Sequence, residues 1–291
     1  MDADNPLVSV IVPSYNHQNY IEECLYSILN QTYKNIQLIV IDDGSSDNTA
    51  AIINKLKETH EFIFEQQENI GLSKTLNKAI TKYAQGKYIS IVASDDFWCT
   101  NKISLQVEAL EKNNNLAMLC GKAKIVNSKS EIISNFNESL FLGKYTFAEI
   151  ALGKCLVVAA TAIIKKEVFD KVGLFDENLL IEDLDMWLRV AVKFEIGFLN
   201  EYVAFYRSHD VNTSLKVVEM NKARFVILNK WTNIDKGLFK KVKRNMELIA
   251  INELGKKYPK EAAKYFNPSF INFLNSKYRK YILSKMFKGR F

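Results

Sequence analysis

Three pairs of carboxylates stand at places in this sequence where a folded chain can use them for chemistry. Asp42-Asp43 and Asp95-Asp96 each follow an apolar run typical of a buried strand, and Glu182-Asp183 opens a helical pattern. Adjacent carboxylates repel one another unless a cation lies near them. Because Mg²⁺ and Mn²⁺ favour one or two carboxylates together with diphosphate oxygens, Ser94-Asp95-Asp96 is a candidate metal-binding turn. Asp43 is able to accept a hydrogen bond from a nucleobase, and Asp183 is able to remove the proton of a reacting hydroxyl.

Each pair also has a purely structural interpretation, which the residues alone leave open. Asp95-Asp96 would then be a solvated turn that caps the next helix. The segment Asp43-Gly44-Ser45-Ser46-Asp47 has the composition of a turn followed by a helix N-cap. Glu182-Asp183 would complement the dipole of the helix that it opens.

The first 125 residues alternate apolar runs with helical stripes and short links. This alternation predicts an α/β fold with an open, mixed, mostly parallel sheet and helices on both faces. In such sheets ligands bind outside the carboxyl ends of the strands. Pro13-Ser14-Tyr15-Asn16, Asp42-Asp43 and Asp95-Asp96 all follow expected strands, so we expect them to converge on one rim.

The regular alternation weakens after about residue 125. A polar stretch over residues 127–138 predicts a hairpin or a loop, and the apolar run from Cys155 to Ile164 predicts a buried strand. Apolar residues at helical spacing predict a helix over 183–192, and the pattern beyond Ser214 is helical. We therefore expect one large domain over residues 1–214 and a helical extension over residues 215–291.

Several classes of protein are excluded or disfavoured by what the sequence lacks. It contains no GxG and no GxxxxGK[ST] pattern, so the dinucleotide fingerprint and the P-loop are absent. Only three histidines are present, which excludes a His-rich zinc site. The acidic N-terminus does not resemble a signal peptide, and the longest apolar run is about half of a membrane span. Four cysteines without CxxC spacing favour reduced, mostly buried thiols, so we expect a cytoplasmic protein.

Charge is divided unevenly along the chain. Residues 215–291 carry 19 Lys+Arg against 5 Asp+Glu, whereas residues 1–214 carry 20 against 28, and the net charge of the chain is +6. In residues 268–291 rings and aliphatic side chains alternate with cations. This pattern fits an interfacial helix on anionic lipid, peripheral to the inner face of the plasma membrane, or a helical cap with a solvated basic face. Nucleic acid is not an expected partner, because the rim at the strand ends is acidic.

A series of motifs runs in order through residues 6–210. Its members are VSVIVPSYN (8–16), SILNQTY (27–33), IVIDDGSSDNT (39–49), NIG (69–71) with Asn77, GKY (86–88) leading into SDD (94–96), FDKVGLFDE (169–177), ED (182–183) and YRSH (206–209). Together they resemble the family 2 glycosyltransferases of GT-A fold. The resemblance implies that residues 6–125 bind the nucleotide sugar and residues 126–214 the acceptor.

The resemblance also implies roles for single residues at the nucleotide. Pro13, Tyr15 and Asn16 would lie at the base and ribose, with Asp43 accepting a hydrogen bond from the base. Lys74 would lie near the nucleotide, although the segment 71–77 lacks the arginine that usually precedes its asparagine.

Further roles concern the diphosphate and the proton. Asp95 would touch the ribose, and Asp96 would bind the Mn²⁺ or Mg²⁺ ion that bridges the diphosphate. His209 would lie near the metal, and Asp183 would be the base that activates the acceptor hydroxyl.

The activity implied is that of a metal-dependent, inverting glycosyltransferase. Its donor would be a nucleoside-diphosphate sugar, most plausibly a UDP-hexose or UDP-N-acetylhexosamine, and its acceptor a glycan or a lipid-linked glycan in cell-surface polysaccharide or glycolipid synthesis. The chain lacks the Gln-x-x-Arg-Trp signature of processive synthases, so we expect one sugar per encounter.

Two other functions stay open. A sugar nucleotidyltransferase shares the metal–diphosphate chemistry, but it needs a triphosphate loop rich in glycine and basic residues near the first strand, where this chain has Pro13-Ser14-Tyr15-Asn16. A non-catalytic, membrane-docking subunit of a glycan assembly complex would have lost a key carboxylate, and all three pairs are intact.

Overall fold

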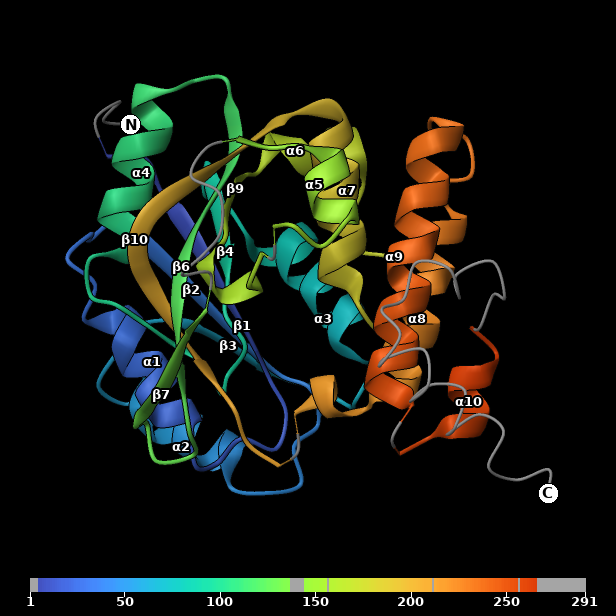
Figure 1. Cartoon of the computed structure of the whole chain (residues 1–291). Coiled ribbons are helices and arrows are strands. Elements are labelled where there is room, and N and C mark those ends of the chain that lie inside the picture. Colours follow the sequence, from blue (N-terminus) through green and yellow to red (C-terminus); the bar gives the residue numbers. More distant parts are fainter. Residues whose placement is uncertain (1–4, 137–143, 156, 211, 256, 266–291) are drawn as a thin grey trace. The chain divides into compact units, whose positions relative to one another are not determined.

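The computed structural model describes residues 5–136, 144–155, 157–210, 212–255 and 257–265 (Figure 1). The chain divides into two compact units. The first comprises Met1–Asn178 and Glu182–His209, and the second comprises Leu179–Ile181 and Asp210–Phe291. The main division therefore falls close to the expected boundary after Ser214.

The amino-terminal half of the first unit builds the parallel part of the sheet. β1 (Val8–Ser14) pairs in parallel with β2 (Ile36–Asp42) on one side and with β4 (Tyr88–Ile91) on the other. β3 (Ile63–Gln66) continues the parallel order beyond β2. Every residue of β1 is buried, as expected for a strand covered on both faces.

The remaining strands make the sheet mixed. β9 (Ile163–Lys165) lies antiparallel between β4 and β6 (Leu116–Val126). β10 (Glu195–Arg207) is parallel to β6, and β5 (Phe97–Trp98) is antiparallel to β10. The strand order is β3-β2-β1-β4-β9-β6-β10-β5, with β7 (Ile132–Phe136) beside β6 and β8 (Lys144–Tyr145) beside β10.

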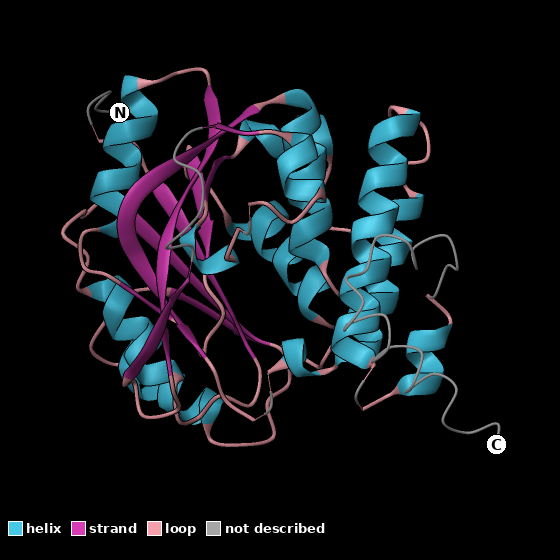
Figure 2. Cartoon of the chain, in the orientation of Figure 1, coloured by secondary structure: helices cyan, strands magenta, loops and turns pink. Residues whose placement is uncertain are grey.

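Helices flank this sheet on both sides (Figure 2). Those on one side are α1 (Ile21–Leu29), α2 (Thr49–Lys57) and α4 (Lys102–Lys112), and those on the other are α3 (Leu72–Lys78), α5 (Phe147–Ala151), α6 (Glu167–Val172) and α7 (Glu182–Lys193). A π-helical turn, Ala79–Tyr83, continues α3. The expected architecture, a mixed α/β sheet flanked by helices, is confirmed.

The region after residue 125 confirms one expectation and corrects another. β6 and β7 form the hairpin expected over residues 127–138. The strand expected over residues 155–164 is wrong for most of its described length, because Ala159–Thr161 is a 3₁₀ turn and, of the run, only Ile163 and Ile164 belong to a strand, β9. Both the backbone N–H and the hydroxyl of Thr161 donate to Val158 O, at 2.8 Å each, so local hydrogen bonds replace a strand ladder there.

A lysine lies in the core of the first unit. Lys102 is 0% exposed, and its Nζ donates to Ser90 Oγ at 2.8 Å and to Gln106 Oε1 at 2.7 Å. The same Nζ lies 4.1 Å from the ring centroid of Trp98. None of these partners carries a negative charge, and burial lowers the pKa of Lys102 well below its usual range.

This lysine predicts a pH dependence of stability. In the unfolded chain Lys102 keeps its proton up to a pH of about 10, whereas the fold favours its neutral form. Below that pH the unfolded chain therefore binds a proton that the folded chain does not, and the free energy of unfolding falls as the pH falls. Between pH 7.5 and 9.5, the free energy of unfolding of the wild type should therefore rise relative to Lys102→Met, by up to about 1.4 kcal/mol per pH unit. Urea titrations of both proteins measure this difference, and parallel pH dependences would contradict the burial argument.

The second unit is helical where it is described. It contains a 3₁₀ turn (Thr213–Leu215), α8 (Val217–Asn229), α9 (Lys236–Leu254) and α10 (Pro259–Ala263). Ala250, Leu254 and Ala262 form its small core, with rings such as Phe225 and Tyr265 packed around them. The basic tail at residues 268–291 lies outside the described residues. Among the residues that are described, no helix has the length and apolarity to cross a bilayer.

Candidate active site

The turn after β4 holds the Asp95-Asp96 pair in a largely buried position. Asp95 is 9% exposed and Asp96 is 5% exposed. His209, which lies just beyond β10, places its Nε2 2.9 Å from Asp95 Oδ2. His17, just beyond β1, has its Nε2 3.9 Å from the same oxygen. The carboxyl ends of these strands thus bring two imidazoles to one carboxylate.

His17 is oriented by its surroundings. Its backbone N–H donates to Thr49 Oγ1 at 2.9 Å, and its Nδ1 lies 2.7 Å from Ser94 Oγ. A hydrogen bond at Nδ1 leaves Nε2 to face Asp95. Sequence reasoning missed His17, although its position directly after the Pro13–Asn16 strand end was a usable signal.

The donor set of this cluster fits a divalent metal. One ligand atom each from His17, Asp95 and His209 lie within 4.8 Å of one another. Two imidazole nitrogens and one carboxylate oxygen suit Mn²⁺ and similar transition metals and leave coordination positions open. The structure therefore groups Asp95, rather than Asp96, with the expected metal ligand His209.

Arg207 holds the acidic turn in place. It is 1% exposed, and its backbone N–H donates to Asp96 Oδ1 at 2.8 Å while its Nε donates to Asp95 O at 2.7 Å. Its Nη2 donates to Glu23 Oε2 at 2.5 Å. The turn is thereby fixed to β10 by both the backbone and the side chain of one residue.

The fold shifts the pKa values of the two aspartates of the turn in opposite directions. Burial, reinforced by the charge of Asp95, raises the pKa of Asp96 well above its usual range. Burial acts on Asp95 as well, but the hydrogen bond from His209 and the charge of His17 outweigh it and lower the pKa of Asp95. Asp95 is thus the member of the pair that the fold keeps as an anion.

Asp43, at the end of β2, accepts several hydrogen bonds. Its Oδ1 accepts from Gln67 Nε2 at 2.8 Å and from Ile70 N at 2.9 Å, and its Oδ2 accepts from Gly71 N at 2.9 Å. Gly44 has φ +79°, and a Cβ there would lie 2.8 Å from Asn69 N, so the turn and the 67–71 loop pack closely. The carboxylate expected to read a base therefore also fixes the loop before α3.

Residues at the end of β1 divide into buried and exposed ones. Pro13 is buried within the strand, whereas Tyr15 is 48% exposed. Asn16 adopts φ +54°, and its Oδ1 accepts from Ser46 N at 2.8 Å, which ties β1 to the Asp43 turn. Lys74 is exposed on α3.

Two exposed apolar side chains join this edge of the sheet. Ile70 is 41% exposed and Leu72 is 46% exposed, and both flank the Gly71 amide that donates to Asp43. With Tyr15 they offer exposed apolar surface near the Asp43 carboxylate. The sequence alone did not single them out, because isolated apolar residues in a loop carry no pattern.

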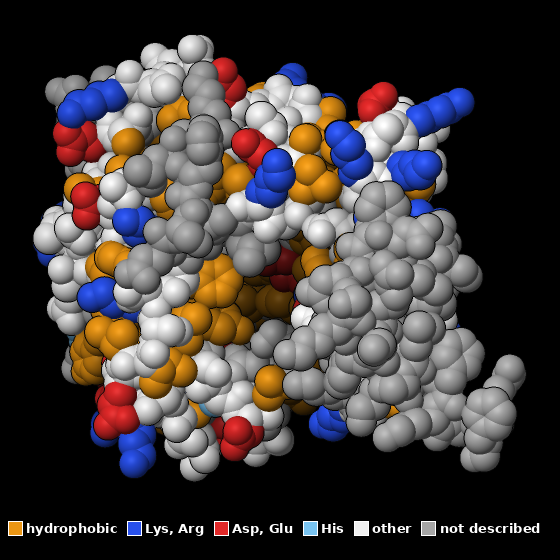
Figure 3. All heavy atoms as spheres, viewed as in Figure 1, with side chains coloured by type: hydrophobic (Ala, Val, Ile, Leu, Met, Phe, Trp, Pro, Cys, Tyr) orange, Lys and Arg blue, Asp and Glu red, His pale blue; other side chains and the backbone are white. Residues whose placement is uncertain are grey.

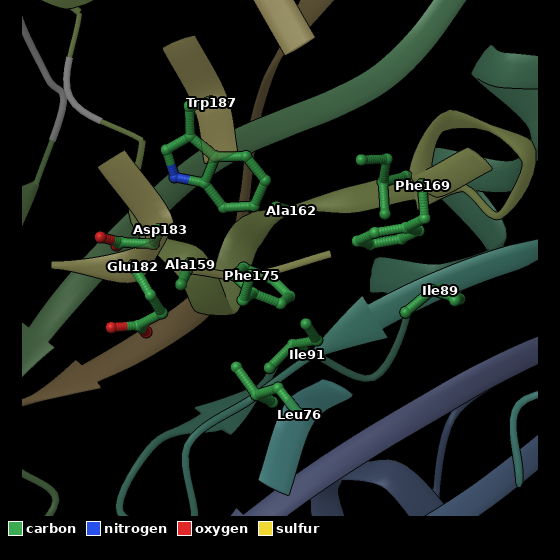
Figure 4. A pocket seen from close by; sticks show the side chains of 11 residues that line it. Leu76, Ile89, Ile91, Ala159, Ala162, Phe169, Phe175, Glu182, Asp183 and Trp187 are labelled. Atoms are coloured by element: carbon green, nitrogen blue, oxygen red, sulfur yellow. The ribbon is translucent and has the colours of Figure 1, made fainter. Parts of the chain in front are cut away.

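Glu182 and Asp183 begin α7 beside a small apolar cavity (Figure 4). Its volume is about 30 Å³, room for one water-sized group. Ile91, three residues before Ser94, lines the same cavity. Trp187 lies one helical turn after Asp183, and its buried indole N–H has no hydrogen-bond partner among the described residues. The space-filling view shows a surface hollow with acidic side chains in its depth and hydrophobic ones beside it (Figure 3).

Burial changes the acidity of this second pair. Burial, helped by the charge of Asp183, raises the pKa of Glu182 to about 8. Burial also raises the pKa of Asp183, whose Oδ1 accepts from Leu184 N at 2.6 Å. A carboxylate with a raised pKa is a stronger base, as proton removal from a hydroxyl requires.

Hydrogen bonds to the preceding loop fix the start of α7. Arg189 donates to Asp185 Oδ2 at 2.8 Å and reaches back to Val172 O at 2.6 Å and Leu174 O at 2.9 Å. Asn77 Oδ1 accepts from Phe175 N at 2.9 Å, which ties the same loop to α3. These contacts give Asn77, singled out in the sequence only as part of a motif, a positioning role.

Comparisons with known proteins identify the family of this chain. Residues 9–173 match the model of glycosyl transferase family 2. An uncharacterized glycosyltransferase of Rickettsia typhi is 34% identical over 232 residues, covering 75% of this chain and 70% of that protein. The Escherichia coli UDP-Glc:alpha-D-GlcNAc-diphosphoundecaprenol beta-1,3-glucosyltransferase WfgD is 30% identical over 197 residues, covering 68% of this chain and 74% of that protein.

A solved structure shares the fold. Staphylococcus aureus TarS 1–349 in complex with UDP-GlcNAc superposes with a TM-score of 0.66 at 18% identity, covering 96% of this chain and 79% of that one. On the family match and the identity to its relatives, the chain belongs to glycosyl transferase family 2.

Proposed function

We propose that the chain transfers one sugar from a UDP-sugar to an acceptor hydroxyl, with inversion at the anomeric carbon and with a divalent metal bound at the acidic turn. The observation that carries the proposal is the grouping of Asp95, His209 and His17 at the carboxyl ends of β4, β10 and β1. Glucosyl transfer by the WfgD relative and the UDP-GlcNAc complex of TarS support a UDP-linked hexose or N-acetylhexosamine as donor.

The nucleoside would bind at the ends of β1 and β2. Tyr15 offers an exposed ring there, and Asp43 offers a carboxylate already held by three donors. An ionised carboxylate has about four acceptor sites, so Asp43 retains capacity for a base N–H. Asn16 would hold this edge in shape, and Lys74, exposed on α3, would meet the phosphates.

The metal held by Asp95, His209 and His17 would be Mn²⁺, since Mg²⁺, the other ion expected from the sequence, prefers oxygen ligands. When bound, such an ion stabilises the negative charge that develops on the leaving diphosphate. The residues present fit it, since the fold keeps Asp95 ionised and holds His17 through Ser94. The resemblance assigned the metal to Asp96. We propose Asp95 as the ligand instead, because its Oδ2 faces both His209 and His17, and we propose that Asp96, which accepts the Arg207 N–H, shapes the turn.

Asp183 would be the base. It lines a cavity together with Ile91 of β4, the strand that leads into Ser94-Asp95-Asp96, and burial raises its pKa. Removal of the hydroxyl proton as the new bond forms makes the acceptor oxygen a nucleophile, and a single in-line displacement inverts the anomeric carbon. The sequence expects donor binding by residues 6–125 and acceptor binding by residues 126–214, and in this proposal His209 of the second part joins Asp95 and His17 of the first at the metal.

The setting would be the assembly of cell-surface polysaccharide or glycolipid. The WfgD relative acts on a diphosphoundecaprenol-linked sugar, which supports a lipid-linked glycan as the acceptor class and a place at the inner face of the plasma membrane.

A donor screen tests the proposal against its rival. The protein is incubated with Mn²⁺ and UDP-, GDP- or dTDP-sugars, and released nucleoside diphosphate is measured, while UTP with sugar 1-phosphates is assayed for released pyrophosphate. We expect UDP release from a UDP-sugar and no pyrophosphate. Pyrophosphate release without UDP release would instead identify a nucleotidyltransferase.

A further inference from the structure

A row of rings and cations crosses one face of the sheet, starting at the acidic turn. Phe97 directly follows Asp96, and its ring stacks on Phe205 with centroids 4.4 Å apart and planes 9° apart. Lys124 Nζ lies 5.9 Å from the ring centroid of Phe205 and 5.3 Å from that of Tyr202. Lys122 Nζ lies 5.4 Å from the Tyr202 centroid. We call Phe97, Phe205, Lys124, Tyr202 and Lys122 the cation–ring row.

Strand register explains why these side chains share a face. Phe205 of β10 pairs with Phe97 of β5 and with Lys124 of β6, and Tyr202 pairs with Lys122. Cross-strand partners point to the same side of a sheet. Side chains of opposite direction on the same strands, Trp98, Ala123 and Ala204, are buried in the core. The row therefore lies on the face of β5, β10 and β6 opposite the buried side chains of Trp98, Ala123 and Ala204.

The row is accessible and carries charge that the fold does not neutralise. Each of its five side chains is partly exposed. Neither Lys122 nor Lys124 forms an ion pair with a carboxylate in the part of the chain that the structure describes. Residues 1–214 carry 28 Asp+Glu against 20 Lys+Arg. The two lysines therefore lack an ion pair although carboxylates outnumber cations in this part of the chain. Two cations kept over rings without an acid are suited to an external anion.

We infer that the cation–ring row binds the acceptor, and that this acceptor is a glycan carrying negative charge. The inference rests on the proposed transferase function and adds the acceptor class to it. The exposed parts of these rings offer apolar surface to the C–H faces of sugar rings, and the two lysines, which lie over the rings, pair with phosphate or carboxylate groups. Because the row begins at Phe97, a glycan lying along it ends beside Asp96, where transfer takes place.

Charge distinguishes this acceptor from other occupants. A neutral glycan needs the rings but gives the two unpaired lysines no partner. Single-stranded nucleic acid also combines stacking with anions, but the net negative charge of residues 1–214 opposes the binding of a long polyanion. An anionic glycan uses both the rings and the lysines over a short length.

A binding experiment with matched variants tests the inference. The full chain is titrated by calorimetry with a glycerol-phosphate oligomer, an oligogalacturonate, a dextran oligomer of similar length and a single-stranded DNA oligomer. The variant Lys122→Gln/Lys124→Gln is compared with Lys55→Gln/Lys57→Gln, which removes the same charge at the same spacing on exposed α2 residues. Stabilisation by UDP with Mn²⁺ is recorded in every preparation, so failure of the donor site is read separately.

We expect one of the two anionic glycans to bind the wild type and the α2 control equally, and the row variant at least about tenfold more weakly. Binding of the glycerol-phosphate oligomer would identify phosphate as the anion, and binding of the oligogalacturonate would identify carboxylate. The inference is overturned if neither binds, if the row variant binds as well as the wild type, or if dextran or DNA binds more tightly than both.

Discussion

Asp183→Asn should lower the rate of sugar transfer by roughly 10²- to 10⁴-fold, the usual contribution of a general base. An amide has nearly the shape of the carboxylate and keeps an oxygen to accept the Leu184 N–H, but it cannot take up the hydroxyl proton. UDP binding should change little, because the nucleoside and metal residues lie at the ends of β1, β2, β4 and β10, whereas Asp183 lies at the start of α7. Released UDP gives the rate and calorimetry gives the affinity. Full transfer by Asp183→Asn would remove Asp183 from the mechanism.

Glu182→Gln is the matched control for Asp183→Asn, and the pH dependence of the transfer rate is measured in both. Since burial raises the pKa of Asp183, its carboxylate gains a proton, and the rate falls, at a pH above the ordinary aspartate value of about 4. Burial, helped by the charge of Asp183, raises the pKa of Glu182 to about 8. Glu182→Gln should retain the acidic limb of the rate profile, because Asp183 produces it. A rate that stays flat down to the ordinary aspartate pKa of about 4, or a limb that disappears in Glu182→Gln, would contradict this assignment.

Arg207→Met should lower the free energy of unfolding by roughly 3–5 kcal/mol, the cost of removing one partner from a buried charged network. The methionine fills space but leaves Asp95 O and Asn127 O without the guanidinium donors, at 2.7 and 3.1 Å, that they have now. Asp96 would keep the backbone N–H at position 207. The acidic turn should therefore loosen on its Asp95 side. Urea denaturation of the apo protein measures the loss.

Arg224→Met serves as the control for this loss. Arg224 also donates to a carboxylate, Glu253 Oε2 at 2.8 Å, but its side chain is 24% exposed and lies in the helical unit. Its removal should cost at most about 1 kcal/mol, as for other exposed ion pairs. Equal losses in the two variants would show that burial of Arg207 does not fix the turn.

Local patterns explain how far the sequence predicted the fold. Apolar runs such as residues 8–12 and 36–41 form strands because both of their faces are covered. The first run is buried throughout, and the second is buried from Leu38 onward. The run 155–164 has the same composition, but its residues 159–161 form a 3₁₀ turn, since Thr161 satisfies its hydrogen bonds within three residues. Apolar composition predicts burial there, whereas the choice between strand and turn depends on hydrogen bonds that composition does not determine.

The candidate site shows the same limit at longer range. The positions of Asp43 and Asp95 could be predicted from the sequence, because each closely follows an apolar run and the end of a strand is a local feature. The contacts that define the cluster join residues far apart in sequence, such as His17 with Ser94 and Arg207 with Asp96. Which aspartate of the Asp95-Asp96 pair faces His209 depends on the conformation of a turn that Arg207 holds. No spacing rule in the sequence encodes that choice.

The central claim, a metal-dependent UDP site built on Asp95, is tested most directly by thermal shift with UDP, with and without Mn²⁺. The wild type should be stabilised by UDP much more strongly when Mn²⁺ is present. Asp95→Asn and His209→Ala should lose this metal-dependent part, while Asp96→Asn, which keeps an oxygen for the Arg207 N–H, should retain most of it. Metal-dependent stabilisation that survives in Asp95→Asn and disappears in Asp96→Asn would return the metal to Asp96. Stabilisation of the wild type that is the same with and without Mn²⁺ would contradict the metal site altogether.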